Sequence, residues 1–144
     1  MDLGIRGKKA LINGGSAGLG KAQRDGFAEA LSRTPPDPRR GLLLCDPSFE
    51  VKTDYQTIPD FFAKLHKRWN VGVLVLWYPI LTSKAHQPML AELARSHPEA
   101  LRHEVRFPPA RPGHGMVGSG LFVLNPPYGL AQEAKTLATR YKSI

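Results

Sequence analysis

Short, continuous apolar runs alternate along the chain with stretches in which apolar residues recur at helical spacing. Residues 10–12, 42–45 and 71–78 form runs with no polar alternation. Such runs, bounded by turn residues, are typical of strands that are buried on both faces of a parallel sheet. Strands that alternate with helices in this way predict an α/β fold with a mostly parallel sheet.

The stretch between the second and third runs carries the strongest helical pattern. Ile58, Phe62, Leu65 and Trp69 recur every third or fourth residue and so share one face of a helix. Thr57 is the predicted N-cap. An earlier helix is predicted within 19–32; it begins near Asp25, because Gly26 is unfavourable inside a helix.

The C-terminal part of the chain predicts a different arrangement. A helix is expected over 86–96, followed by a strand over 101–107 in which apolar and polar residues alternate. A loop rich in Gly and Pro over 108–120 separates this strand from the next one, 121–124. The two strands are close enough in sequence to pair antiparallel, and 130–141 gives a final amphipathic helix.

Composition and charge narrow the class of protein. The chain has 144 residues, of which 42% are hydrophobic, and this length is enough for one folded domain. Its formal net charge is +8, so its surface is basic. Such a charge suits a polyanionic partner, although an ordinary basic surface is the alternative interpretation. The longest apolar run is far shorter than the roughly 20 residues that span a bilayer, so no membrane association is expected.

Cysteine and histidine usage argues against a metal or disulfide framework. Cys45 is the single cysteine and lies inside a predicted buried strand, so no disulfide is expected within one chain. The five histidines show no ligand spacing, and we expect no metal site; His114, in the glycine-rich loop, is the one histidine kept as a candidate. Together these features favour a cytoplasmic protein.

The first chemical candidate is Asp46, which ends the apolar run 42–45 and is followed by Pro47, Ser48 and Phe49. Ligands of open α/β sheets bind outside the carboxyl ends of the strands. An Asp46 side-chain oxygen and the Pro47 carbonyl would each accept an N–H bond from an exocyclic amine of a base, and Phe49 would stack on a base flipped out of its helix. The alternative interpretation is an ordinary turn after a strand.

Two further motifs compete with this one. The sequence Asn125-Pro126-Pro127-Tyr128 matches the Asp/Asn-Pro-Pro-aromatic signature of adenine-N6 methyltransferases more closely than residues 46–49 do. It is interpreted as a turn before the last helix or as a wall of an RNA channel.

Gly14, Gly18 and Gly20 form a loop suited to phosphate binding. Residues 1–22 resemble the start of a short-chain dehydrogenase, yet no tyrosine is followed four positions later by lysine, as that family's catalysis requires.

From residue 24 onward the order of motifs resembles the RlmJ family, bacterial large-subunit ribosomal RNA adenine-N6 methyltransferases. The matching stretches are 24–27, 39–44, 46–55, 76–79, 115–120 and 125–127. The resemblance implies a truncated Rossmann-like fold that uses S-adenosylmethionine, with a mostly parallel sheet and an antiparallel last strand. It implies methylation of N6 of an adenine in 23S ribosomal RNA.

The resemblance also implies roles for individual residues. Asp46 matches the catalytic acidic residue, and Asp25 with Gly26 matches a pair that contacts the cofactor. Pro47, Ser48 and Phe49 match the substrate-binding segment. The family has an N-terminal half that is not found here, so we interpret the chain as a dehydrogenase-like start, 1–22, joined to the C-terminal part of a methyltransferase, 23–144.

Three functions therefore compete at this stage. The first is an RNA adenine methyltransferase, or the catalytic half of one, centred on Asp46. The second is a non-catalytic nucleotide-binding module that uses the loop from Gly14 to Gly20. The third is an inactive remnant of a fusion. The oligomeric state and the particular adenine are not predicted by the sequence.

Overall fold

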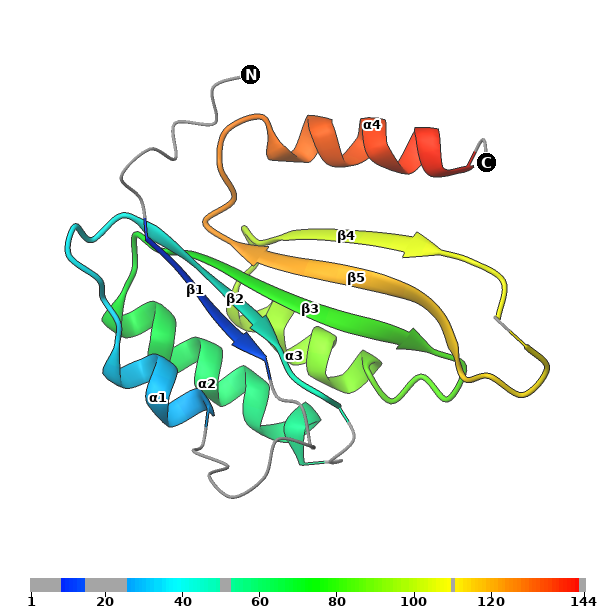
Figure 1. Cartoon of the computed structure of the whole chain (residues 1–144), viewed down its shortest axis with the longest axis horizontal. Coiled ribbons are helices and arrows are strands. Elements are labelled where there is room, and N and C mark those ends of the chain that lie inside the picture. Colours follow the sequence, from blue (N-terminus) through cyan, green and yellow to red (C-terminus); the bar gives the residue numbers. More distant parts are fainter. Residues whose placement is uncertain (1–8, 15–25, 50–52, 110, 143–144) are drawn as a thin grey trace.

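The computed structural model describes residues 9–14, 26–49, 53–109 and 111–142. Five strands form one sheet in the order β1-β2-β3-β5-β4 (Figure 1). The first three strands run parallel, and β5 is antiparallel to both β3 and β4. Their bounds are Lys9–Gly14 (β1), Gly41–Asp46 (β2), Val73–Leu81 (β3), Leu101–Arg106 (β4) and Met116–Leu124 (β5).

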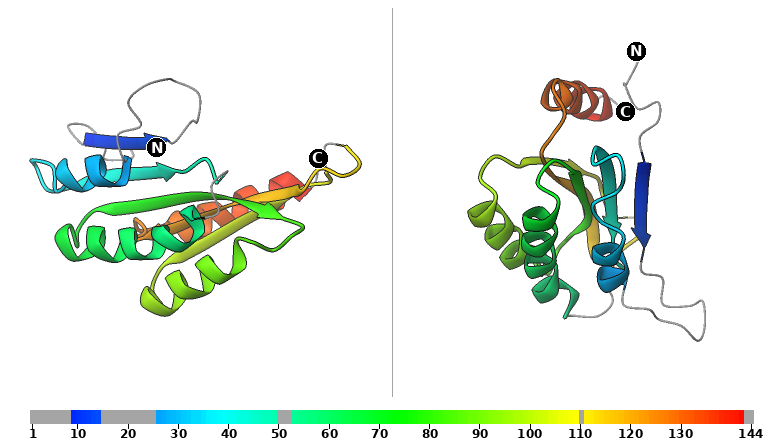
Figure 2. Two further views of the ribbon diagram at one scale, coloured as in Figure 1. Left: turned by 90° about the horizontal axis from the view of Figure 1, so that it is seen from below. Right: turned by 90° about the vertical axis from the view of Figure 1, so that its left-hand side faces the viewer.

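Helices cover this sheet unequally. The helices α1 (Gly26–Ser32), α2 (Asp54–Arg68) and α3 (Gln87–Ser96) all lie on one face, whereas α4 (Leu130–Lys142) runs along the β4 edge (Figures 1 and 2). No described helix is both long enough and apolar enough to cross a membrane. The described part of the chain is thus a sheet with one helical layer.

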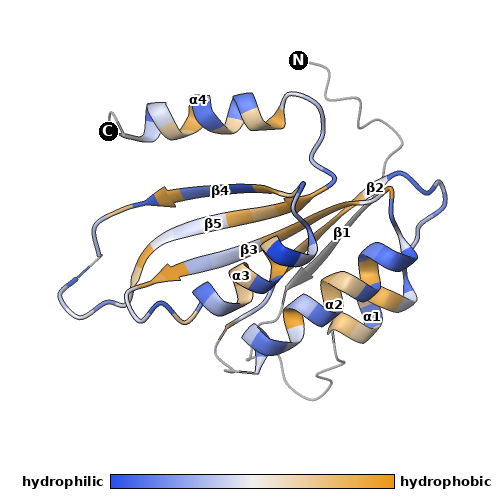
Figure 3. Cartoon of the chain, turned by 180° about the vertical axis from the view of Figure 1, so that it is seen from behind, coloured by the Kyte–Doolittle hydropathy of each residue, from blue (hydrophilic) through white to orange (hydrophobic). Residues whose placement is uncertain are grey.

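The core lies between the sheet and helices α1 to α3. Leu43, Leu76 and Tyr78 point into it and have no exposed surface, as do Phe62 and Leu65 of α2. The apolar sides of these helices face the strands, and their polar sides face outward (Figure 3). Burial of this apolar surface is the main term that stabilises the fold.

On the opposite face, β2 and β3 have no helix over them in the described part of the chain (Figure 2), whereas Val123 of β5, the register partner of Val75, is buried there. We call this part of the sheet the bare face and define it by Leu42 and Leu44 of β2 and Val73, Val75 and Trp77 of β3. Leu42 keeps 36% of its surface exposed, and the other four are half-buried. The apolar runs predicted burial on both faces, but the described helices cover β2 and β3 on only one face.

The order of elements agrees with the sequence prediction, and several boundaries differ. α2 begins at Asp54 after Thr53, so the prediction of Thr57 as N-cap was wrong. The hydroxyl of Thr57 instead donates to the Thr53 carbonyl at 3.2 Å, within the first turn. β3 continues past Pro79, and β5 begins at Met116 instead of near residue 121.

The predicted join between two segments, near residue 22, lies outside the described residues. β1 comes from the dehydrogenase-like segment, and it pairs in parallel with β2 over their whole length. This strand therefore belongs to the same sheet as the rest of the chain, and the division into 1–22 and 23–144 stays a prediction.

Candidate active site

Asp46 lies where the carboxyl ends of the parallel strands meet. It is the last residue of β2, and its register partner Gly14 is the last residue of β1. Its side chain is exposed, whereas its neighbour Cys45 is fully buried. Because side chains alternate along a strand, Asp46 shares the bare face with Leu42 and Leu44. A reacting group can therefore reach the carboxylate from that side.

The residues after Asp46 hold an aromatic ring close by. Pro47 is buried, Ser48 is half-buried, and Phe49 has a φ of 54°. A bulky residue in this left-handed region is uncommon and persists only where the surrounding structure holds it. The Phe49 ring packs at 4.9 Å from that of Tyr55 and 6.5 Å from that of Trp77, between ring centres.

Tyr55 is a site residue to which the sequence assigned no role. It lies in the first turn of α2, and its hydroxyl is buried without a hydrogen-bond partner in the described structure. Burial raises the pKa of Tyr55, and the Asp54 carboxylate adds to this, so the hydroxyl keeps its proton. A buried hydroxyl without a partner is costly, which makes it a candidate to bond a ligand.

The predicted cofactor-binding residues are only partly described. Gly26 is the first residue of α1, and Asp25 lies outside the described residues. α1 connects two parallel strands, so its start lies at the same edge of the sheet as the end of β1 (Figure 1). The loop after Gly14, which includes Gly18 and Gly20, also lies outside the described residues.

The second methylase-like signature lies at the opposite edge of the sheet. β5 runs antiparallel to β3, and its last residue, Leu124, pairs with Leu74 near the start of β3. The Asn125 amide donates to the carbonyls of Asn70 and Gly72 at 2.9 and 2.8 Å, so both of its N–H bonds are used within the fold. This placement supports the interpretation of 125–128 as the turn before α4.

Cys45 is unsuited to nucleophilic chemistry although it adjoins Asp46. Burial raises the pKa of its thiol to about 12, with further contributions from Asp46 and Asp54. Only the thiolate is an effective nucleophile. In the described part of the chain, no three His, Cys, Asp or Glu side chains gather into a group that could hold a metal ion.

Basic side chains follow the strands that end at the same edge. Lys84 comes just after β3, Arg106 ends β4, and Arg111 with His114 lies in the connection to β5; all four are exposed. The Nδ1 atom of His114 lies 3.4 Å from the Met116 carbonyl oxygen. This edge therefore carries positive charge beside the aromatic cluster.

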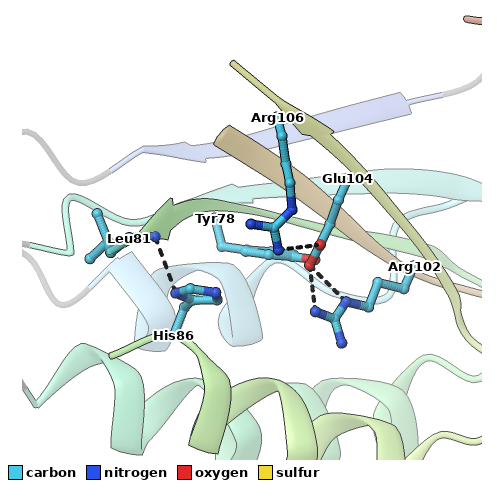
Figure 4. Close-up of polar contacts among 6 residues, drawn as sticks. All are labelled: Tyr78, Leu81, His86, Arg102, Glu104 and Arg106. Atoms are coloured by element: carbon cyan, nitrogen blue, oxygen red, sulfur yellow. Dashed lines mark hydrogen bonds and ion pairs between the residues drawn. The ribbon is translucent and has the colours of Figure 1, made fainter. Parts of the chain in front are cut away.

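A polar cluster joins β3 to β4 on the helix-covered face (Figure 4). The Tyr78 hydroxyl donates to Glu104 at 3.0 Å, and the Arg102 guanidinium donates to the same carboxylate. Arg106 lies 3.6 Å from Glu104, and the His86 ring stacks on Tyr78. Burial raises the pKa of Tyr78, and the Glu104 carboxylate adds to this, so we interpret the cluster as structural.

A parallel sheet with crossover helices and an antiparallel final strand, with an acidic residue at the carboxyl edge, defines a Rossmann-like fold of the methyltransferase class. A family model described as "Ribosomal RNA large subunit methyltransferase D, RlmJ" matches residues 16–142. The chain belongs to this RlmJ family.

Two curated relatives of the chain share one name. The chain is 38% identical over 110 residues to the "Ribosomal RNA large subunit methyltransferase J" of Escherichia coli (strain K12), which covers 76% of this chain and 39% of that protein. It is 32% identical over 114 residues to the Haemophilus influenzae protein of that name, covering 78% of this chain and 41% of the relative. The chain thus spans about two fifths of the length of the curated relatives it matches.

A solved structure shows the same arrangement of elements. The crystal structure of a Legionella pneumophila protein superposes with a TM-score of 0.75 at 28% sequence identity. The superposition covers 83% of this chain and 44% of the solved chain. More than half of that relative therefore lies outside the part that this chain matches.

Proposed function

We propose that this chain carries the base-orienting part of an S-adenosylmethionine-dependent methyltransferase that modifies N6 of an adenine in 23S ribosomal RNA. The observation that supports this most is the exposed Asp46 at the carboxyl edge, followed by Phe49 in its unusual backbone conformation. Membership of the RlmJ family supports the same reaction class.

Asp46 and Pro47 act on the acceptor nitrogen. The exocyclic amine of adenine is a poor nucleophile because its lone pair is delocalised into the ring. An Asp46 oxygen and the Pro47 carbonyl each accept one N–H bond, which draws the nitrogen toward a tetrahedral shape and frees the lone pair. Pro47 has a fixed φ, which helps to hold its carbonyl in one direction.

The aromatic cluster of Phe49, Tyr55 and Trp77 holds the base. Phe49 offers a ring beside the carboxylate, and its contacts with the other two rings restrict its motion. Stacking on an aromatic side chain contributes about 1–3 kcal/mol per base and offsets part of the cost of unstacking it from RNA. We expect the Tyr55 hydroxyl, which is buried without a partner in the described structure, to donate a hydrogen bond to the bound nucleotide or cofactor.

The described residues fit one side of a cofactor site. An exposed carboxylate and aromatic faces at the carboxyl edge suit a cationic sulfonium group. S-adenosylmethionine would supply the methyl group that the amine accepts. Gly26, together with Asp25, would contact the cofactor at the start of α1, and Asp46 would hold the amine in line with the methyl.

Charge supports ribosomal RNA as the partner. The chain has a formal net charge of +8, and Lys84, Arg106 and Arg111 lie at the same edge as Asp46. Contacts of such side chains with phosphates position a nucleic acid without reading its sequence. We therefore expect RNA binding to weaken steeply as salt concentration rises.

The reaction is tested by transfer of a radiolabelled methyl group from S-adenosylmethionine to 23S ribosomal RNA isolated from an E. coli strain that lacks its RlmJ relative. N6-methyladenosine is identified by mass spectrometry of the digested RNA. We expect incorporation by the wild-type chain, and a loss on the order of 10²–10³-fold in Asp46→Ala, because the amine loses its orienting acceptor.

The matched control is Asp60→Ala, which removes an exposed carboxylate from α2 away from the site and should leave the rate unchanged. Methylation of another atom, an Asp46→Ala variant as active as wild type, or no incorporation by folded protein would contradict the proposal.

A further inference from the structure

We propose that the edge of the sheet opposite Asp46 is a second RNA-binding surface, on which Arg39 and Arg40 bind phosphates and Tyr128 stacks on an unpaired base. We call these three residues the amino-edge surface. The proposal rests on the proposed function for its choice of RNA as the ligand, and it adds a place where the substrate binds away from the reacting base.

The turn 69–72, between α2 and β3, holds both parts of this surface. The Trp69 indole N–H donates to the Arg39 carbonyl, and the Asn125 amide donates to two carbonyls of the same turn. The turn itself is closed by a hydrogen bond from the Gly72 amide to the Trp69 carbonyl at 3.2 Å. The arginine segment and the segment that leads to Tyr128 are therefore fixed to one support.

The sheet register places the two parts close together. β2 and β5 flank β3, and Arg40 precedes β2 at the edge where Asn125 follows β5 (Figure 1). Neighbouring strands are about 4.8 Å apart, so about 10 Å separates the backbones of these two residues. The surface is thus compact enough for one short RNA segment to contact both parts.

The same geometry gives the distance to the candidate active site. Asp46 ends the strand that Arg40 precedes, so the two residues are about 20 Å apart along β2. At a rise of about 3.4 Å per nucleotide, roughly six nucleotides span this distance. One RNA molecule can therefore contact both edges of the sheet.

Tyr128 has the exposure expected of a ring that serves a ligand. Its side chain is fully exposed, and within the described residues it makes no ring contact or hydrogen bond. Pro126 and Pro127 precede it, and their fixed φ angles limit the motion of the segment that presents the ring. An exposed aromatic face beside basic side chains is the arrangement that stacks unpaired bases of single-stranded nucleic acids.

The segments around the surface carry a local excess of positive charge. Residues 33–40 and 67–72 contain five basic side chains and one acidic one. Two of the basic side chains are bonded within the fold, whereas Arg39 and Arg40 are exposed and have no ion pair among the described residues. Free guanidinium groups suit phosphate oxygens. An acidic peptide would pair with the arginines but leave the Tyr128 ring unused, so the combination favours RNA.

The first test measures stacking. Fluorescein-labelled oligouridine of roughly 12 nucleotides, an unpaired RNA, is titrated by fluorescence anisotropy without S-adenosylmethionine. Tyr128→Ala should weaken binding about 5- to 150-fold, because one stacked base is lost. Tyr128→Phe keeps the ring and should bind like wild type. Tyr141→Ala is the matched control, because it removes another exposed tyrosine, near the other end of α4.

The second test measures the phosphate contacts. Arg39→Ala and Arg40→Ala leave the backbone unchanged, including the carbonyl that Trp69 uses. Each should lower the slope of log Kd against log salt concentration by about 0.7, the value for one phosphate contact with a single strand. Arg95→Ala removes an exposed arginine from α3, on the other side of α2 from residues 39–40 (Figure 2), and should leave the slope unchanged.

A third measurement links the surface to the proposed reaction. In the methyl-transfer assay with 23S ribosomal RNA, Tyr128→Ala should raise KM for RNA and leave kcat unchanged, because the surface holds RNA away from the reacting base. The binding assays contain no methyl donor. An inactive chain that shows the expected binding would therefore count against the proposed reaction alone.

Each outcome bears on the proposal directly. Tyr128→Ala that binds oligouridine like wild type would overturn it, as would Tyr128→Phe that binds as weakly as Tyr128→Ala. Equal reductions of the salt slope by Arg95→Ala and Arg40→Ala would show that net charge alone attracts RNA, and would also overturn it. Circular dichroism checks the fold of each variant, and we expect no change because every substituted side chain is exposed.

Discussion

The two faces of strand β2 carry nearly the same residue types in very different surroundings. Leu43 and Cys45 on the helix-covered face have no exposed surface, whereas Leu42, one position away, keeps 36% of its surface exposed. The difference comes from which layer lies opposite, because the residues share one strand. The comparison shows that an apolar residue in a strand does not by itself predict whether a helix of the described chain covers its face of the sheet.

The two faces of the sheet also differ in role: the covered face stabilises the fold, and the bare face leads to the candidate site. The covered face contains the large buried side chains, including Tyr78, Phe62 and Phe122, which hold the fold together. The bare face contains Trp77 and leads to Asp46 at the carboxyl edge. A binding site must stay accessible until its ligand arrives, so its residues lie where packing is least complete.

The largest effect should come from truncating matched leucines on the two faces. Leu43→Ala removes a fully buried side chain and should lower the free energy of unfolding by about 2–5 kcal/mol. Leu42→Ala removes an exposed leucine from the same strand and should cost less than about 1 kcal/mol. Urea unfolding followed by circular dichroism measures both; equal losses would mean that the two faces are equally covered in solution.

A smaller effect should appear where β5 crosses the covered face. A Cβ atom added at Gly120 would lie 2.2 Å from Tyr78 Cζ, so Gly120→Ala should lower the free energy of unfolding by about 1–3 kcal/mol. At Gly115 the nearest atom is Thr82 Oγ1 at 3.8 Å, and Gly115→Ala should stay within about 0.5 kcal/mol of wild type. An unchanged free energy of unfolding in Gly120→Ala would contradict the close packing of β5 against Tyr78.

The smallest effect should be a pH dependence at the polar end of the covered face. Burial acts to raise the pKa of Glu104, but the hydrogen bonds from Arg102 and Tyr78 outweigh it and lower the pKa below its ordinary value of 4.5. A carboxyl of this kind stabilises the fold above its unfolded pKa, and the contribution is lost as pH falls through the folded pKa.

The check is thermal unfolding of wild type and Glu104→Gln between pH 6 and pH 3. Wild type should lose more stability than the variant as the pH falls below about 4.5, by about 1 kcal/mol or less because the cluster is partly solvated. Parallel pH profiles of the two proteins would show that Glu104 has no linked titration.

The sequence predicted the order and type of the elements because their hydrophobic periods are strong. The boundaries it missed have local causes. The predicted strand 71–78 stops before Pro79, yet Pro79 lies within β3, opposite Ser119. Gly118 and Gly120 were taken as loop residues, although they lie in β5, where added Cβ atoms would clash with Val105 and Tyr78. Close packing between strands is not encoded in periodicity.

The candidate site was predictable in part. Asp46 and Phe49 stand out because a carboxylate, a proline and a ring follow an apolar strand directly. Tyr55 was missed because its approach to Phe49 depends on how α2 folds back toward β2. At Asn125 the sequence motif matched the methyltransferase signature better than the segment at Asp46 does. Only the structure shows that the Asn125 amide donates to the segment before β3.

The central position of β3 has a consequence for the motions of the sheet. β3 pairs with β2 in parallel on one side and with β5 antiparallel on the other, whereas β1 pairs on one side only within the described chain. Backbone amides in strands held from both sides exchange with solvent deuterium only in rare, large openings, while edge strands open locally. Amide protons of β3 should therefore exchange orders of magnitude more slowly than those of β1. Local opening of the sheet should begin at its β1 edge while the central strand stays paired.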